Sequence, residues 1–263
     1  MGSALWFRLL GARLRSEMQY RASFALVVGT TFLFSFLDFV AVLAIFVRLD
    51  AIEGWTFGEV ALLYGASGVA FNLANVLVAG IDTAAEHIRT GTFDTLLLRP
   101  VSTITQLTAQ AELKRIGRLL QAAVVLVIAC VTVDQPWSVA DVVGLVVLIA
   151  SGAGIFGAIW VMVAAIGFWT VDNRGIGNTF TYAGAYFTYY PLDVFTGWLR
   201  QIALVVPFAF VSYLPVSHLL GKEPAYDLPS TIGLASPVVA TVLAIVAAGV
   251  WRVGIRHYRS TGS

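Results

Sequence analysis

Charged residues are scarce in this chain: Asp, Glu, Lys and Arg together make up 12% of its 263 residues. Soluble domains carry about 25%. The mean hydropathy is +0.85, and long apolar runs recur along the sequence. Most of the chain is therefore expected to lie in a lipid bilayer as an all-α polytopic membrane protein, because a membrane β-barrel would show alternating segments of about ten residues.

Motifs for catalysis and metal binding are also absent. Cysteine occurs once, at Cys130, and the histidines His87, His218 and His257 lie in separate loops or ends. The sequence has no G-x-x-x-x-G-K-[ST] phosphate loop, no H-E-x-x-H and no G-x-S-x-G. We therefore expect no catalytic residue, metal or cofactor in this chain. The net charge of +1 gives no indication of a nucleic-acid partner.

Six apolar stretches approach the length of about 20 helical residues that a bilayer core requires. They predict six transmembrane helices, at 22–47, 57–81, 116–133, 142–169, 176–190 and 234–253. The stretch 1–21 that precedes them is predicted to hold an interfacial helix, because apolar residues recur every four positions opposite Arg8 and Arg15. An ordinary solvated helix is the alternative for this stretch.

The apolar region between the fifth and sixth spans is interrupted by Pro191, Pro207 and Pro215 and contains Asp193 and Arg200. Such a segment is expected to break rather than to run straight through lipid. We interpret 191–230 as a re-entrant hairpin followed by a loop on the outer side. An additional full span is the alternative, and it would move the C-terminus to the other side of the membrane.

The distribution of Lys and Arg sets the orientation. With six spans, every Lys and Arg except Arg48, Arg200 and Lys222 falls on the side of the two termini. The positive-inside rule assigns that side to the cytoplasm, so both termini are predicted to be cytoplasmic. No internal repeat is visible, and 1–263 is treated as a single membrane domain.

The segment 82–115, between the second and third spans, is rich in charged residues, in contrast to the apolar sequence on either side. Gly91 is expected to break the chain, and Pro100 to end the short helix that follows. Asp94 would lie in the favourable first turn of that helix. Thr103 and Gln106 are spaced as a capping box for the next helix.

Phe93, Leu96 and Leu97 occupy positions i, i+3 and i+4 of the short helix and therefore share one face. This pattern predicts an exposed apolar knob on the cytoplasmic side. Such a knob either docks into a groove of a partner protein or lies on the lipid surface.

The run Arg89-Thr-Gly-Thr-Phe-Asp-Thr-Leu-Leu-Leu-Arg-Pro100 resembles the I-x-x-G-x-[FL]-D-x-x-L-x-[RK]-P signature of exporter permeases in the ABC-2 superfamily. The stretch 190–215 resembles a second signature of the same bacterial branch. The order of features also matches along nearly the whole chain: interfacial helix, six spans, coupling helix after the second span, and re-entrant hairpin before the sixth.

The resemblance implies a permease subunit in the bacterial cytoplasmic membrane, surrounded by lipid. Two copies of a separate ATPase subunit would bind ATP and Mg and drive it, and a second, non-identical permease would complete the pathway. In this family the helix after the second span enters a groove on the ATPase. The residues so implied in coupling are the knob Phe93, Leu96 and Leu97, its polar frame Glu86, Arg89, Asp94 and Arg99, and the end residues Gly91 and Pro100.

Three polar residues lie within predicted spans, where polar groups are costly unless protein or water faces them. Asp38 either faces the translocation path or a subunit interface, or extends its carboxylate to the outer headgroups. Asn72 and Asn75 lie three apart on the second span, where they either hydrogen-bond between helices or line a polar path.

The function that these observations favour is export of a lipid or hydrophobic small molecule through a pathway of which this chain forms half. A gradient-driven secondary transporter or channel of similar span count is the alternative. A structural or sensory membrane scaffold is a third interpretation, but it would need no coupling helix.

Overall fold

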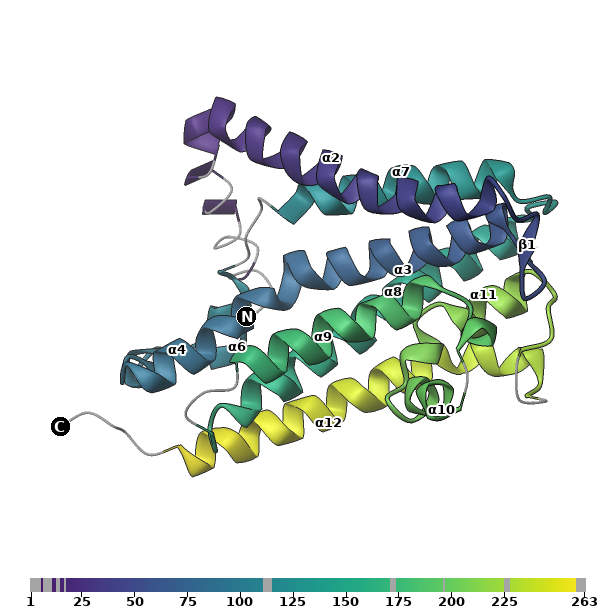
Figure 1. Cartoon of the computed structure of the whole chain (residues 1–263). Helices are drawn as coiled ribbons and strands as arrows, with labels where there is room; N and C mark the ends of the chain where they lie inside the picture. Colours follow the sequence, from purple (N-terminus) through teal and green to yellow (C-terminus); the bar gives the residue numbers. More distant parts are fainter. Residues whose placement is uncertain are drawn as a thin grey trace.

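The computed structural model describes residues 6, 11–12, 15–16, 18–110, 115–170, 174–195, 197–224 and 228–258, with the backbone alone at 79 and 174–181. Most of the predicted interfacial helix therefore lies outside the described residues. Six long helices run side by side (Figure 1). They are α2 (Arg21–Phe46), α3 (Phe57–Val78), α7 (Ile116–Thr132), α8 (Val139–Ile166), α9 (Arg174–Tyr189) and α12 (Ser236–His257).

Each predicted span coincides with one of these helices. In the described part of the chain, four segments are long and apolar enough to cross a membrane: Arg21–Phe46, Phe57–Val78, Val139–Ile166 and Ser230–His257. Helices α7 and α9 are shorter, at 17 and 16 residues. The helical, multi-pass architecture is thus confirmed, whereas a count of six crossings stays a prediction.

The end of α8 away from the predicted cytoplasmic side shows why a helix starts there. Ser138 and Asp141 form a capping box: the Asp141 amide donates to Ser138 Oγ at 3.2 Å, and the Ser138 amide donates to Asp141 Oδ2 at 2.9 Å. This cap satisfies amides that the first turn leaves without helical partners. The helix consequently begins three residues before the predicted start of the span at 142.

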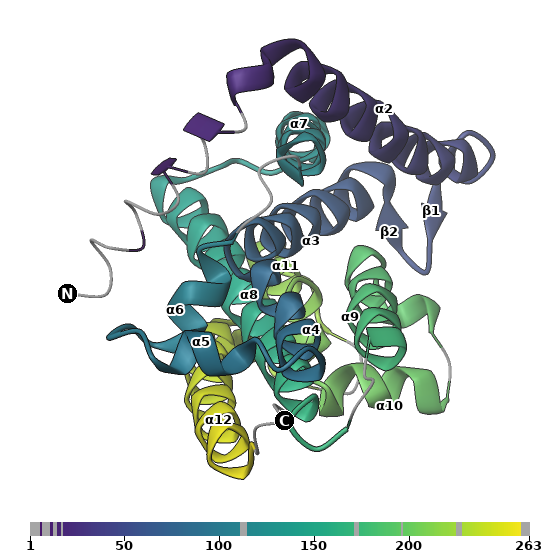
Figure 2. The same cartoon turned by 90° about the vertical axis from the view of Figure 1, so that its left-hand side faces the viewer.

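Helix α3 lies at the centre of the bundle and packs against α7, α8 and α9, while α12 packs on α8 and α2 on α7 (Figures 1 and 2). In the most apolar stretch of α3, 83% of the residues are buried, against 11% for α2. Gly65 permits a close approach of α3 to α7, because a Cβ there would lie 2.7 Å from Leu126 Cα of α7. A helix that is apolar all round is suited to this enclosed position.

The connections gather at the two ends of the bundle. At one end lie η2 (Ala79–Thr83), α4 (Ala84–Arg89), α5 (Phe93–Leu97) and α6 (Thr103–Thr108). The start of α2 and the end of α12 lie at this same end (Figure 1). At the opposite end, the antiparallel strands β1 (Ala51–Ile52) and β2 (Trp55–Thr56) form a hairpin beside η4 (Leu192–Val194), α10 (Trp198–Val205), η5 (Phe208–Phe210), α11 (Tyr213–Leu219) and η6 (Ser230–Ala235).

The segment after α9 is broken, as the prolines predict. Trp198–Val205 and Phe208–Leu219 meet at a bend of 68°, a shape that fits both a re-entrant hairpin and a broken span. Arg200 stabilises the turn before α10, because its guanidinium donates to the carbonyl oxygens of Asp193 at 2.9 Å and Phe195 at 2.8 Å. The arginine thus satisfies backbone acceptors that no helix provides for.

A polar network closes this hairpin end. Asp193 accepts hydrogen bonds from Trp55 Nε1 at 2.8 Å and from the Tyr213 hydroxyl at 3.0 Å. Lys222 pairs with Glu59 at 2.8 Å and lies over the Trp55 ring at 4.6 Å from its centroid. The network joins the hairpin and the start of α3 to the broken segment.

Candidate functional site

The segment between α3 and α7 folds into three short helices across one end of the bundle. Figure 2 looks onto this end and shows α4, α5 and α6 gathered in front of α8 and beside α12. Gly91 lies between α4 and α5 with a φ of 72°, so the predicted break is there and needs a glycine. Glu86 and Arg89 of α4 form an exposed ion pair at 3.0 Å.

The predicted exposure of the apolar knob is wrong for Phe93 and Leu96 and right for Leu97. Phe93 is 0% exposed and Leu96 4%, because this face of α5 packs against helices of the same chain. Leu97 is 43% exposed and Leu98 85%. The apolar surface that a partner can reach is therefore formed by Leu97 and Leu98, next to the exposed Arg99 and Pro100.

Phe93 belongs to a cluster of four aromatic rings, which we call the aromatic cluster: Phe93, Phe168, Trp251 and Tyr258. The Phe93 ring centroid lies 5.3 Å from that of Phe168 and 5.1 Å from that of Tyr258. Phe168, in the turn after α8, lies 5.2 Å from Trp251 of α12. Edge-to-face contacts of this kind add to the burial of the rings. The cluster connects α5 to the ends of α8 and α12.

Asp94 of α5 lies near the residue that follows α12, Tyr258. Burial and the Asp94 carboxylate beside it raise the pKa of the Tyr258 hydroxyl. The predicted polar frame thus divides: Asp94 is turned toward the protein's own chain, whereas Arg89 and Arg99 are exposed.

The turn between α5 and α6 is held by side chains. Ser102, not Thr103, caps α6 and accepts from the Thr105 amide at 3.2 Å. Gln106 donates across the turn to the carbonyl oxygens of Leu96 at 2.9 Å and Val101 at 2.8 Å. The predicted capping box is therefore wrong, because Thr103 is already inside the helix, where it accepts from Trp251 Nε1 at 3.0 Å.

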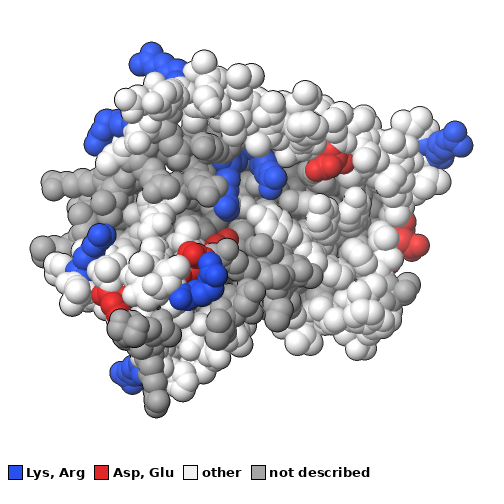
Figure 3. All heavy atoms as spheres, turned by 60° about the vertical axis from the view of Figure 1, so that its left-hand side comes forward, with Lys and Arg blue, Asp and Glu red and all other residues white. Residues whose placement is uncertain are grey.

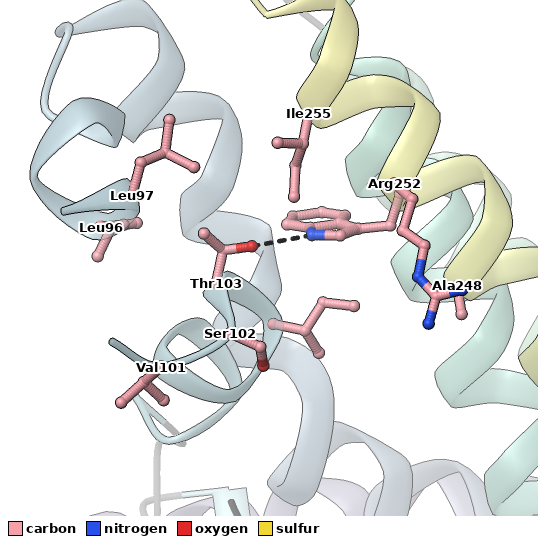
Figure 4. A pocket seen from close by; sticks show the side chains of 10 residues that line it. Leu96, Leu97, Val101, Ser102, Thr103, Ala248, Arg252 and Ile255 are labelled. Carbon is pink, nitrogen blue, oxygen red and sulfur yellow. Dashed lines mark hydrogen bonds between the residues drawn. The ribbon is translucent and has the colours of Figure 1, made fainter. Parts of the chain in front are cut away.

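An apolar groove of 470 Å³ lies between this turn and α12 (Figure 4). Leu97 and Ile255 face it from opposite sides, and the Trp251–Thr103 hydrogen bond lies between them. Arg252 is its only charged lining residue among those described. The complete lining is Leu96, Leu97, Val101, Ser102, Thr103, Ile104, Ala248, Trp251, Arg252 and Ile255.

A second cavity, of 770 Å³, lies between α2, α3, α7 and α9 and is far more polar. It brings together Asp38 and Asn72, two of the three polar residues singled out in the spans. Asn75 does not line it; this residue is 1% exposed and accepts a hydrogen bond from Arg115 Nη1. We call this space the polar cavity.

Sequence reasoning missed several residues at both places. Arg118 and Gln121 line the polar cavity with Tyr64, Tyr186 and Tyr189, and their i, i+3 spacing at the start of α7 was the available signal. Phe168 and Tyr258 gave no local signal, because they lie 75 and 165 positions from Phe93 along the chain.

A family model described as ABC-2 family transporter protein matches residues 32–262. The match includes the α4–α6 segment, the aromatic cluster and every lining residue of the polar cavity except Thr31. Comparison with curated proteins and with solved structures gave no match.

Proposed function

This chain belongs to the ABC-2 family of transporter proteins and is a multi-pass ABC transporter permease, and we propose that it forms half of an export pathway driven by a separate ATPase subunit. The observation that supports this most directly is the α4–α6 segment. It presents exposed leucines outward and buries its other face in the ends of α8 and α12. A coupling element needs both an accessible surface and a firm connection to the spans.

The docking surface consists of Leu97, Leu98 and Arg99, flanked by the Glu86–Arg89 pair. Exposed leucines on a short helix fit an apolar groove, and the flanking charges provide orientation rather than affinity. Phe93 and Leu96 have a different role from the one predicted: they hold the helix to this chain. Gly91 and Pro100 set the ends of the element.

Movement of the docking surface is transmitted along two routes. The aromatic cluster passes displacement of α5 to α8 and α12, and η2 continues directly into α3, whose Asn72 lines the polar cavity. ATP-driven closure of the two ATPase copies, which hold the ATP and Mg, would thus tilt these helices and reshape the cavity. Interdigitated helices with two discrete arrangements are how such movements travel.

The proposed orientation places the α4 end in the cytoplasm of a bacterium. This end carries Arg21, Arg89, Arg99, Arg115 and Arg252, whereas the hairpin end carries Arg48 and Lys222. Figure 3 shows basic groups mostly toward the same side of a face that is otherwise largely uncharged. The sparsely buried α2 offers a surface for lipid or for a second, homologous permease.

The docking proposal is tested by recovering the ATPase subunit with tagged permease from detergent extracts of its own membranes. We expect Leu97→Glu with Leu98→Glu to reduce ATPase recovery at least tenfold. Leu49→Glu is the matched control, because Leu49 is 49% exposed but lies at the opposite end of the bundle. Equal recovery with the double variant would remove the docking assignment.

A gradient-driven transporter is the second candidate, and the charged groups of the polar cavity are the observation that favours it. The two functions differ in their energy source. Proteoliposomes with this chain alone should show no transport under an ion gradient, and transport should require the ATPase, ATP and the second permease. Gradient-driven transport by the chain alone would establish the second candidate instead.

A further inference from the structure

The polar cavity holds two side chains of opposite charge that do not pair. Asp38 of α2 and Arg118 of α7 both line it. Within the described residues, neither takes part in an ion pair or a hydrogen bond, either with the other or with a neighbour. Asp38 lies within the candidate span α2 and Arg118 in the first turn of α7, and both side chains are exposed. Ionisable groups within spans are rare and commonly mark binding sites or transport paths.

The two charges lie at different levels of the cavity. Gly117, next to Arg118, packs against one turn of α2, because a Cβ there would lie 2.3 Å from Val28 O and 3.1 Å from Phe32 N. Asp38 lies six residues beyond Phe32, which is about 9 Å along the helix axis. Arg118 is therefore nearer the α4 end, and Asp38 nearer the hairpin end. A ligand that satisfies both must carry two separated charges.

Two buried amide side chains in the lining each have one atom without a hydrogen-bond partner among the described residues. Asn72 is 5% exposed; its Nδ2 donates to Gly68 O at 2.8 Å, while its Oδ1 has no hydrogen-bond partner among the described residues. Gln121 is 3% exposed, and its Nε2 makes no hydrogen bond to any described acceptor, the nearby Tyr64 hydroxyl included. Buried polar groups are nearly always satisfied. An acceptor and a donor are therefore available to a polar ligand.

Tyrosine rings line the cavity near these groups. The ring centroids of Tyr64 and Tyr189 are 4.7 Å apart, and those of Tyr186 and Tyr189 5.9 Å. Aromatic faces attract organic cations, most strongly where water is excluded. Together with the Asp38 carboxylate, these rings form a setting for an ammonium group.

The mouth of the cavity is apolar. Phe34 is 68% exposed, Leu37 54% and Tyr186 62%, and all three line the cavity. Phe34 and Leu37 lie on α2, a candidate span whose most apolar stretch is only 11% buried. A ligand that enters here from the bilayer needs an apolar tail.

We propose that the polar cavity binds the head of a zwitterionic amphiphile. The ammonium group lies against Asp38 and the tyrosines, the anionic group against Arg118, and the tail along Phe34 and Leu37. A purely cationic or purely anionic ligand would leave one of the charged side chains unpaired. The proposal rests on the permease function proposed above and specifies its substrate class.

Binding is measured on the full chain in nanodiscs, without ATPase, by displacement of a fluorescent short-chain phosphatidylethanolamine. Three competitors share a dodecyl tail: dodecylphosphocholine is zwitterionic, dodecyl phosphate anionic and dodecyltrimethylammonium cationic, each used below its micelle concentration. We expect the zwitterion to bind at least tenfold more tightly than the other two. Free phosphocholine tests whether the tail is needed, and we expect it to bind at least tenfold more weakly than the dodecyl form.

The variants should change selectivity reciprocally. Asp38→Asn is expected to weaken binding of the zwitterion and of the cation at least tenfold but to leave binding of the anion unchanged. Arg118→Gln is expected to weaken binding of the zwitterion and of the anion but to leave binding of the cation unchanged. Arg118→Lys keeps the charge and should retain preference for the zwitterion, which separates recognition from a folding defect. Arg48→Gln and Asp50→Asn, outside the cavity, are matched controls that should leave every affinity unchanged.

Three results would overturn the proposal: equal affinity for the three competitors, a preference for the cation or the anion in the wild type, or unchanged zwitterion affinity in both neutralised variants. Thermal unfolding, followed by tryptophan fluorescence, confirms that each variant is folded. Because no ATPase is present, failure here is distinct from failure of the docking proposal, which is tested by ATPase recovery.

Discussion

Phe93 of α5 and Phe168 after α8 meet edge to face, with ring centroids 5.3 Å apart and an interplanar angle of 77°. The contact places a residue from the connection between α3 and α7 against the end of a helix that begins more than 40 residues later. It makes the short helix part of the core of the bundle. In the proposed coupling mechanism Phe93 therefore transmits movement, whereas its exposed neighbour Leu97 is available to a partner.

Truncation of Phe93 should separate docking from coupling. Phe93→Ala empties a fully buried site, which costs about 3–5 kcal/mol for a phenylalanine. We expect ATPase recovery to persist, because the exposed leucines are intact, while substrate-stimulated ATP hydrolysis falls at least fivefold. Phe93→Leu keeps most of the volume and should retain most of the stimulation. Full stimulation in the alanine variant would contradict a transmitting role.

The turn at Gly91 should not accept a branched side chain. Its φ of 72° costs a β-branched residue at least about 1–2 kcal/mol, so Gly91→Val should lower the unfolding temperature and displace α5. Gly29 is the matched control, because nothing lies within 4 Å of a Cβ there and its φ is ordinary. Gly29→Val should leave ATPase recovery unchanged. If both variants lost ATPase recovery equally, the loss would reflect a general effect of replacing glycine by valine and not the turn at Gly91.

The hairpin end should loosen when Asp193 loses its charge. Two donors, from Trp55 and Tyr213, converge on this carboxylate, and hydrogen bonds to a charged group contribute about 1.5–3 kcal/mol each. Asp193→Asn should therefore lower the unfolding temperature and increase quenching of tryptophan fluorescence by acrylamide. Asp50→Asn, exposed in the loop after α2, provides the comparison and should leave both measurements unchanged.

Alkaline pH should act through Tyr258. Burial and the Asp94 carboxylate raise its pKa above the value of about 10 for a free tyrosine. As the pH rises, the unfolded chain therefore loses this proton before the folded chain does. The free energy of unfolding is thus unaffected by Tyr258 below about pH 10 and declines as the pH rises further. We expect Tyr258→Phe to unfold with less dependence on pH above 10 than the wild type. Parallel curves for the two proteins would contradict this assignment.

The sequence was sufficient to locate the helices. Apolar length, the position of Arg and Lys, and the prolines after α9 are local signals, and the helices and the bend lie where they predict. The orientation of the side chains could not be predicted from local sequence signals. The same i, i+3, i+4 pattern fits an exposed knob and a buried face, and the choice depends on Phe168 and Tyr258, which the chain brings from far away.

The candidate site was predicted in part for the same reason. Gly91, Asp38 and Asn72 were identified because a glycine between helices and polar groups in spans are unusual wherever they occur. Arg118 was counted only as one of many basic residues near a membrane surface. Its place opposite Asp38 in one cavity depends on how α2 and α7 pack, and no spacing within either helix specifies that.

The contact between Gly65 and Leu126 has a practical consequence for following the transport cycle. Backbones packed too closely to admit a methyl group resist displacement, so we expect α3 and α7 to keep their separation through the cycle. The distance between probes attached to α3 and α7 would therefore stay constant and serve as an internal reference. Distances from that reference to α2 and α9 would then report directly how the cavity opens and shuts.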